Sequence, residues 1–182
     1  MWVVTAALDL ANVQPGQKLL DIGSGDGRWC REATKRGLYA VGWEVDAGIR
    51  KAATEIAALD GSTAVFMDVD CYAGPLTGFD WIVWSLNRDD KAAETLATRL
   101  ALGQRAILWG APVDGLKKLV QVELPCEMRR NDSYSVQLQM PFLTHWDEYW
   151  SKQPVADLVR LFGSAEPQSK LKGAVKIYVQ GL

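Results

Sequence analysis

The residues with the clearest chemical potential in this sequence are an acid near the end of an apolar run and three alternate glycines that follow the run. These residues, with the serine between the first two glycines, are Asp21, Gly23, Ser24, Gly25 and Gly27. The apolar segment, 18–22, is short and bounded by turn residues, which is typical of a buried parallel strand. Glycines after such a strand let a ligand approach the backbone, and a helix that follows directs N–H groups at it. We therefore predict a ligand-binding loop.

The spacing of the glycines excludes two common phosphate-binding loops. A dinucleotide site needs the pattern GxGxxG, but counting from Gly23 the sixth position is Arg28. A P-loop needs Gly-Lys-Ser or Gly-Lys-Thr, and the sequence contains neither tripeptide. Asp21, two residues before the first glycine, would repel a pyrophosphate, whereas it suits a cationic group. The loop therefore favours a ligand with a positive charge near the end of the strand.

Alternating strands and helices in the first 110 residues must position this loop. Short apolar runs predict buried strands, and apolar residues at helical spacing predict helices between them. The expected strands are 18–22, 39–45, 63–67, 79–86 and 105–109, and the expected helices are 2–12, 27–36, one capped by Asp46 and ending at Gly61, and one capped by Asp89 or Asp90 and ending at Gly103. This alternation predicts a doubly wound α/β sheet, mostly parallel, with helices on both faces and ligands at the carboxyl ends of the strands.

The remainder of the chain follows a different pattern. Strands are expected at 119–124, 134–140 and 174–179, and a helix is expected at 155–162. Strands that follow one another through short turns predict antiparallel edge strands added to the parallel sheet. We expect one domain over 1–182, in which 1–110 binds the cofactor and 111–182 supplies C-terminal strands on the acceptor side.

Composition and charge narrow the class of protein. The 182 residues are 48% hydrophobic, enough for the core of one domain. Twenty basic and 22 acidic residues give a net charge of -2 without a long run of either sign, which disfavours nucleic acid as a partner. No signal-peptide pattern or membrane span is present, so we expect a cytoplasmic protein without membrane insertion. Three widely spaced cysteines and one histidine predict no metal site.

The complete loop pattern, DxGxGxG, resembles the fingerprint of the class I S-adenosylmethionine-dependent methyltransferases, and the resemblance covers at least residues 1–110. It implies S-adenosylmethionine as the cofactor, held by Asp21 and the glycines. It also implies that Glu44, at the end of the second expected strand, accepts hydrogen bonds from both ribose hydroxyls. Asp68, at the end of the third, would accept one from the adenine amino group, with the Val69 N–H available to the ring.

A closer resemblance is to the small protein-lysine methyltransferases of archaea and their mitochondrial relatives. It is carried by 23–28, which reads GSGDGR, and by 41–46 and 103–105. The sequence lacks the YxPTP segment of that family. It also has Ser85 where the family has a bulky aromatic residue, and Leu-Trp at 108–109 where the family has Ser-His. The resemblance implies methyl transfer to an amine, with a protein lysine as the expected case.

Methyl transfer to an amine requires alignment of the acceptor with the cofactor's methyl group more than it requires acid or base groups. The sulfonium of the cofactor already activates the methyl group, so the protein mainly orients the acceptor and excludes water. A lysine, with an ordinary pKa of about 10.4, must first lose its proton, which desolvation between aromatic walls would promote. Trp84 and Trp109, at the ends of two expected strands, either form such walls or pack in the core. No catalytic residue is assigned, and the acceptor-side candidates are Trp84, Ser85, Asn87 and Trp109.

Two alternatives stay open. The acceptor could be a small molecule, for which the C-terminal 70 or so residues would supply the pocket. The protein could also bind S-adenosylmethionine without catalysis, because the sequence after the fourth expected strand departs from the related enzymes. The sequence leaves the acceptor and the oligomeric state undetermined.

Overall fold

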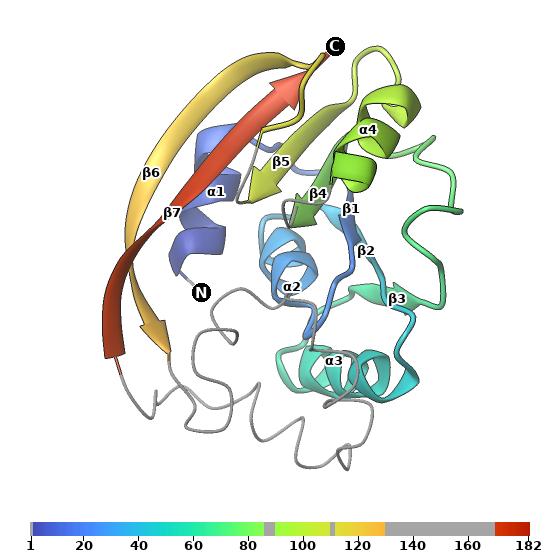
Figure 1. Cartoon of the computed structure of the whole chain (residues 1–182). Coiled ribbons are helices and arrows are strands. Elements are labelled where there is room, and N and C mark those ends of the chain that lie inside the picture. The colour runs from blue at the N-terminus through green and yellow to red at the C-terminus, as the bar shows by residue number, and fades with distance from the viewer. Residues whose placement is uncertain (1, 86–89, 110–111, 130–169) are drawn as a thin grey trace.

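The computed structural model describes residues 2–85, 90–109, 112–129 and 170–182, which form a twisted sheet flanked by helices (Figure 1). The helices are α1 (Trp2–Ala11), α2 (Arg28–Lys35), α3 (Ala47–Leu59) and α4 (Asp90–Arg99). The strands are β1 (Lys18–Ile22), β2 (Tyr39–Trp43), β3 (Val65–Met67), β4 (Trp81–Ser85), β5 (Arg105–Trp109), β6 (Lys117–Arg129) and β7 (Lys170–Gly181).

The sheet has seven strands in the order β3-β2-β1-β4-β5-β7-β6. Strands β1 to β5 are parallel to one another, whereas β7 runs antiparallel to both β5 and β6. The predicted fold class, a doubly wound sheet with antiparallel edge strands, is confirmed. The strand order reverses between β1 and β4, and ligands of such sheets bind at this reversal, beyond the carboxyl ends of the strands. The glycine-rich loop after β1 lies at that point.

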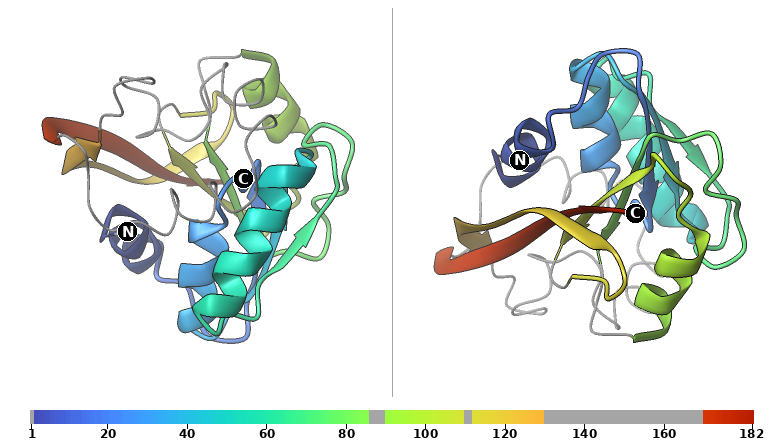
Figure 2. Two further views of the ribbon diagram at one scale, coloured as in Figure 1. Left: turned by 90° about the horizontal axis from the view of Figure 1, so that it is seen from below. Right: turned by 90° about the horizontal axis from the view of Figure 1, so that it is seen from above.

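The core lies on both faces of the sheet. On one face, α1 and α2 pack against alternate residues of the central strands, such as Leu19 and Val83. On the other face, α4 packs against the intervening residues, such as Leu20 and Ile82. Figure 2 shows these two layers of helices on opposite sides of the sheet. Since both faces are covered, β1 and β4 read as continuous apolar runs, as expected of central parallel strands.

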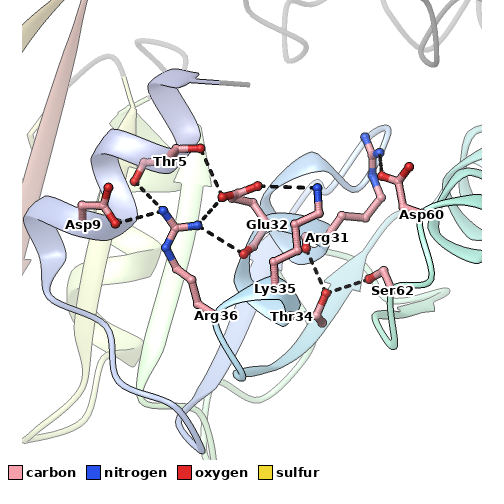
Figure 3. A network of polar contacts seen from close by, with 9 residues as sticks. All are labelled: Thr5, Asp9, Arg31, Glu32, Thr34, Lys35, Arg36, Asp60 and Ser62. Atoms are coloured by element: carbon pink, nitrogen blue, oxygen red, sulfur yellow. Dashed lines mark hydrogen bonds and ion pairs between the residues drawn. The ribbon is translucent and has the colours of Figure 1, made fainter.

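A polar network joins α2 to the helices on either side of it (Figure 3). The guanidinium of Arg36 donates to the carboxylates of Asp9 and Glu32 and to the backbone oxygen of Thr5, which ties α1 to α2. Arg31 forms an ion pair with Asp60 at the end of α3. These contacts fix the position of α2, whose first residue directly follows the glycine-rich loop.

Two strands begin later than the sequence predicts, and a hydrogen bond to a side chain lies just before the start of each. The carboxylate of Asp80 accepts a hydrogen bond from the Lys18 N–H at 2.7 Å, and β4 begins at the next residue, Trp81, instead of residue 79. The Ser62 hydroxyl accepts one from the Ala64 N–H at 3.2 Å, and β3 begins at the next residue, Val65, instead of residue 63.

The two antiparallel strands are longer than predicted. β6 and β7 pair with each other from Lys117 opposite Gly181 to Arg129 opposite Lys170. Backbone pairing extends them beyond 119–124 and 174–179, the segments whose sequence pattern predicted strands. The predicted strand 134–140 and helix 155–162 lie outside the described residues. None of the helices that the structure describes has the length and apolar character needed to cross a membrane.

Candidate cofactor and acceptor site

The loop from Gly23 to Gly27, here called the glycine loop, needs glycine at three positions. Gly23, Gly25 and Gly27 have φ angles of 67°, 53° and 72°, in the left-handed region that other residues avoid. The loop is fixed to the sheet because the Ser24 N–H donates to the Trp43 carbonyl oxygen at 2.8 Å. The three alternate glycines of the sequence pattern therefore produce a tight, anchored turn at the carboxyl end of β1.

Gly27 is also required by packing. A Cβ atom at this position would lie 2.3 Å from Cζ of Phe66 in β3, far closer than atoms in contact approach. The ring of Phe66 thus occupies the space beside the start of α2. Packing therefore requires glycine at the last position of the pattern, independently of any ligand.

Glu44 joins the end of β2 to the glycine loop. Its side chain is buried, with 7% of the residue exposed. The carboxylate accepts hydrogen bonds from the Gly25 N–H at 3.1 Å and from the Asp46 N–H at 3.0 Å. Because each carboxylate oxygen can accept two hydrogen bonds, these contacts are compatible with acceptance of ligand hydroxyls as well. The structure therefore brings the predicted Glu44 and Gly25 into direct contact.

Asp21 is a buried acid within the same site. Only 1% of the residue is exposed, and its Oδ1 has no hydrogen-bond partner among the described residues. Its Oδ2 lies 4.0 Å from the thiol sulfur of Cys30 in α2. Burial, followed by the negative charges of Asp26 and Glu44, raises the pKa of Asp21 well above its ordinary value, while Arg28 opposes this shift. A buried carboxylate oxygen with an unused acceptor site fits a cationic ligand group.

An ion pair between Asp26 and Arg28 was not predicted from the sequence. The Asp26 carboxylate accepts hydrogen bonds from the Arg28 side chain, with a shortest separation of 2.7 Å, and from the Arg28 N–H at 3.1 Å. Burial acts to raise the pKa of Asp26, but the charge and hydrogen bonds of Arg28 outweigh it and lower this pKa. The available signal was an acid and a base separated by one glycine at the start of a helix.

Asp68 and Val69 lie at the carboxyl end of β3, beside the end of β2. Asp68 is exposed, and its carboxylate lies 3.2 Å from the guanidinium of Arg50 in α3. Arg50 also donates to the Glu44 carbonyl oxygen at 2.7 Å, so one side chain links both strand ends. The Val69 N–H, expected to be available to an adenine ring, donates to the Met67 carbonyl oxygen at 3.1 Å. A ligand that used this N–H would have to replace that bond.

The acceptor-side candidates cluster at the carboxyl ends of β4 and β5. Ser85 and Trp109, the last residues of these strands, are paired in the sheet register. Trp84 is buried, and its ring stands edge-on to that of Tyr72, with centroids 6.2 Å apart and an interplanar angle of 65°. Tyr72 lies in the irregular segment between β3 and β4, where the sequence showed no periodicity that singled it out. Asn87 lies outside the described residues.

The segment that contains Tyr72 is fixed by hydrogen bonds from α4 and by packing against the end of β2. The guanidinium of Arg99 in α4 donates to the Cys71 carbonyl oxygen at 2.7 Å and to the carbonyl oxygen of Gly74. A Cβ atom at Gly74 would lie 2.4 Å from the Trp43 ring, so the segment packs directly on the end of β2. Tyr72 is therefore presented at the same edge of the sheet as the glycine loop.

Solved structures with a similar fold include methyltransferases in complex with S-adenosyl-L-homocysteine. An RNA methyltransferase from Salinibacter ruber, solved in complex with this product, is 26% identical over 66% of this chain and 82% of its own, with a TM-score of 0.61. A putative methyltransferase from Bacillus halodurans is 12% identical over 97% of both chains, with a TM-score of 0.64. A Pyrococcus abyssi tRNA (uracil-54, C5)-methyltransferase, also solved with the product, is 12% identical over 98% of this chain and 38% of its own, with a TM-score of 0.58.

By its fold, the chain is an S-adenosylmethionine-dependent methyltransferase. The sequence matches no protein-family model, and no curated protein is significantly similar to it. The likeness is therefore carried by the structure. The cofactor that belongs to this methyltransferase fold is S-adenosylmethionine, whose amino-acid end carries an ammonium group.

The residues of this methyltransferase fit such a cofactor. The unpartnered Oδ1 of Asp21 can accept a hydrogen bond from an ammonium group, and the left-handed glycines leave the backbone of the loop open to close approach. Glu44 lies against the loop, and its carboxylate oxygens can accept further hydrogen bonds. Within the described parts of the methyltransferase, no group of three or more metal-binding side chains gathers.

Proposed function

We propose that this methyltransferase transfers the methyl group of S-adenosylmethionine to an amine, with a protein lysine as the first acceptor to test. The hydrogen bond of 3.1 Å between the Glu44 carboxylate and the Gly25 N–H best supports the part of this proposal that concerns the cofactor. This bond joins the glycine loop and the acid after β2 into one site, as a ligand with a ribose and a cationic amino-acid end requires. A generic nucleotide loop would not need Asp21 and Glu44 together.

The chain's own residues would mainly orient the two reactants. The cofactor supplies an electrophilic methyl group, whose bond to sulfur breaks as the amine nitrogen takes it. Asp21, the glycine loop and Glu44 would hold the cofactor, while Asp68 would extend the site toward its adenine. The nitrogen must be uncharged to react, so an ammonium acceptor would first release a proton to the solvent. Burial of the acceptor beside the glycine loop would favour this loss of charge.

The ring of Tyr72 supports an amine acceptor. Trp84 packs in the hydrophobic core, and the exposed ring of Tyr72 stands against it, where it can face a cationic or partly cationic group. Trp84 directly precedes Ser85 at the carboxyl end of β4, where an acceptor would meet the methyl group. The resemblance of the GSGDGR segment to protein-lysine methyltransferases adds to this support.

A transfer assay separates the possible acceptors. The protein is incubated with methyl-labelled S-adenosylmethionine and, in separate reactions, with lysate proteins, a small-molecule extract and total RNA. The RNA arm is included because the Salinibacter ruber neighbour is an RNA methyltransferase. We expect label on lysine side chains of protein, and its loss in the Glu44→Gln variant.

Other outcomes have distinct meanings. Label confined to small molecules would replace the protein acceptor with the small-molecule alternative, and label confined to RNA would overturn the amine proposal. Binding of S-adenosylmethionine without transfer to any fraction would favour the inactive binding protein. The Glu55→Gln variant, in which an exposed acid of α3 is neutralised, is the matched control and should retain full activity.

A further inference from the structure

The edge of the sheet at β3 carries a group of exposed apolar side chains. Tyr39, Val65 and Met67 are 67%, 54% and 46% exposed. Val41 is in register with Val65, and Trp43 with Met67, so the alternate residues 39, 41 and 43 of β2 share one face of the sheet with Val65 and Met67. The three exposed side chains on this face are here called the β3 patch. Apolar residues gathered in this way indicate an interaction site, whereas single ones do not.

The β3 patch is exposed because the connection from β3 to β4 contains no helix. In a doubly wound sheet, the helices in the connections between parallel strands cover both faces. Here residues 68–80 form only turns and irregular structure, and α3, which joins β2 to β3, lies with α2 on the opposite face (Figure 2). Gly74 packs on the ring of Trp43, so this connection covers the end of β2 and leaves the outer strand open.

The backbone of β3 is also open on its outer side. The Glu44 N–H donates to the Met67 carbonyl oxygen at 3.0 Å, so the peptide groups of Met67 face β2. Because these groups alternate in direction along a strand, the N–H and the carbonyl oxygen of Phe66 point away from β2. β3 is the first strand in the sheet order, and none of the described strands pairs with its outer side. Such an edge can pair with a further strand.

The two edges of the sheet differ in their protection against strand pairing. Charged residues and proline on an edge strand discourage pairing with another chain. The edge strand β6 contains Lys117, Lys118, Glu123, Pro125, Glu127 and Arg129. The edge strand β3 has the sequence Val-Phe-Met, with neither a charged residue nor a proline. An apolar, unprotected edge at β3 is expected if this edge is covered by a partner.

We propose that the β3 patch is the interface of a homodimer, in which β3 of two copies pair antiparallel about a twofold axis beside Phe66. Phe66 of each copy would exchange two backbone hydrogen bonds with Phe66 of the other, and Val65 would stand directly opposite Met67 of the second copy. The chain would thereby build one continuous sheet across the axis. This inference concerns assembly and does not depend on the cofactor or on the acceptor.

The charges around β3 are compatible with this pairing. A twofold interface brings a surface against itself, so a charge near the axis would meet its own copy. The acid nearest to β3 in sequence, Asp68, lies two positions from the axis and is paired with Arg50 at 3.2 Å. In the proposed register Asp68 would stand opposite Ala64 of the second copy and away from the other Asp68. No like charges therefore meet at the centre.

The size of the surface predicts a weak dimer. One short pair of strands and a small patch from each copy place the interface at the low end of protein–protein interfaces, below about 1,200 Å² of total buried area. We therefore expect a Kd for dimerisation on the order of 10 µM and a monomer at high dilution.

Sedimentation velocity of the full chain, from about 1 to 500 µM, measures this equilibrium. The wild type should change from monomer to dimer over this range. Val65→Lys, a change at an exposed position, brings two like charges close to the axis and should raise the Kd on the order of 10-fold or more. Leu102→Lys is the matched control, because Leu102 is 88% exposed in the turn between α4 and β5. It should dimerise as the wild type does.

Pairs of cysteines test the register. After oxidation with diamide, a mixture of the Val65→Cys and Met67→Cys variants should give a disulfide-linked dimer, because the two positions face each other. Each variant alone should give much less, since its cysteines would stand on a diagonal about 7–8 Å apart, and the wild type shows the background from the native cysteines.

The inference is overturned if the wild type stays monomeric at the highest concentration, a result that needs no variant to fold. A dimer that Val65→Lys leaves intact, or one in which the cysteine mixture links no more than each variant alone, would place the interface elsewhere and would also overturn it. These outcomes are independent of methyl transfer, so they are distinguishable from a failure of the proposed function.

Discussion

The carboxyl group of Asp21 lies in surroundings that oppose its ionisation. Burial raises its pKa, and the charges of Asp26 and Glu44 add to the effect. Between the ordinary pKa of an aspartate in the unfolded chain and this raised pKa, the folded protein holds a proton that the unfolded chain releases. Stability therefore falls as the pH rises through this window. Ionised Asp21 therefore lowers stability, which is consistent with its proposed role in cofactor binding.

The Asp21→Asn variant should be more stable than the wild type and bind cofactor more weakly. The neutral amide removes the buried charge, so the midpoint of thermal unfolding should rise at pH 7 and rise less at pH 4, with about 2–4 °C for each kcal/mol gained. Titration should show weaker binding of S-adenosylhomocysteine. Equal changes in unfolding temperature at the two pH values would contradict the role of ionisation.

Gly27 and Gly61 offer a matched pair of glycine substitutions. Both have left-handed φ angles, 72° and 65°, but a Cβ atom at Gly27 would overlap Phe66, whereas one at Gly61 would meet nothing within 4 Å. Gly61→Ala should cost about 1–2 kcal/mol of unfolding free energy, from backbone strain alone. Gly27→Ala should cost about 1–3 kcal/mol more, because the ring must move. Urea unfolding measures both, and equal losses would exclude the steric contribution.

Some residues of the site could be predicted from the sequence, and others could not. Asp21 lies near the end of an apolar run, and Glu44 and the glycines directly follow such runs, so their positions at strand ends could be inferred. The hydrogen bond between Glu44 and Gly25 depends on the side-chain conformation of Glu44, which no sequence spacing determines. The pairing of Asp26 with Arg28 depends in the same way on rotamers at the start of a helix.

The elements around the site were predicted best where local signals are strong. Asp46 was predicted to cap a helix, and its carboxylate accepts a hydrogen bond from the Ile49 N–H at 2.8 Å at the start of α3. The segment between β3 and β4 has no such signal, and Tyr72 is placed there by long-range contacts from Arg99 and by packing on Trp43. Contacts between residues distant in sequence decide positions that periodicity does not.

Removal of the cap at Asp46 should destabilise the protein through α3. Asp46→Ala leaves the Ile49 N–H without its side-chain acceptor and should lower the free energy of unfolding by about 1 kcal/mol. Asp46→Asn keeps an acceptor oxygen and should lose only a small part of this. The two variants are compared by urea unfolding, and a loss of the same size in both would show that charge, and not the cap, is responsible.

At the scale of the whole molecule, the topology of the sheet assembles the site. Asp21, Glu44 and Asp68 are far apart in sequence, but each lies at the carboxyl end of one of three strands, and the order β3-β2-β1 places these strands side by side. The opposite half of the sheet, β4 and β5, brings Ser85 next to Trp109 in register. The strand ends that we propose to bind the cofactor and the acceptor therefore meet at the reversal of strand order, between β1 and β4 (Figure 1).

Titration of S-adenosylhomocysteine into the wild type and into Glu44→Gln tests most directly whether the glycine loop and the acid after β2 form a cofactor site. We predict one site per chain in the wild type and binding weaker by on the order of 10-fold or more in Glu44→Gln, because charge-assisted hydrogen bonds to the ribose are lost. The Glu55→Gln control should bind as the wild type does. Absence of binding to the wild type, or equal binding by wild type and Glu44→Gln, would contradict a cofactor site at this loop.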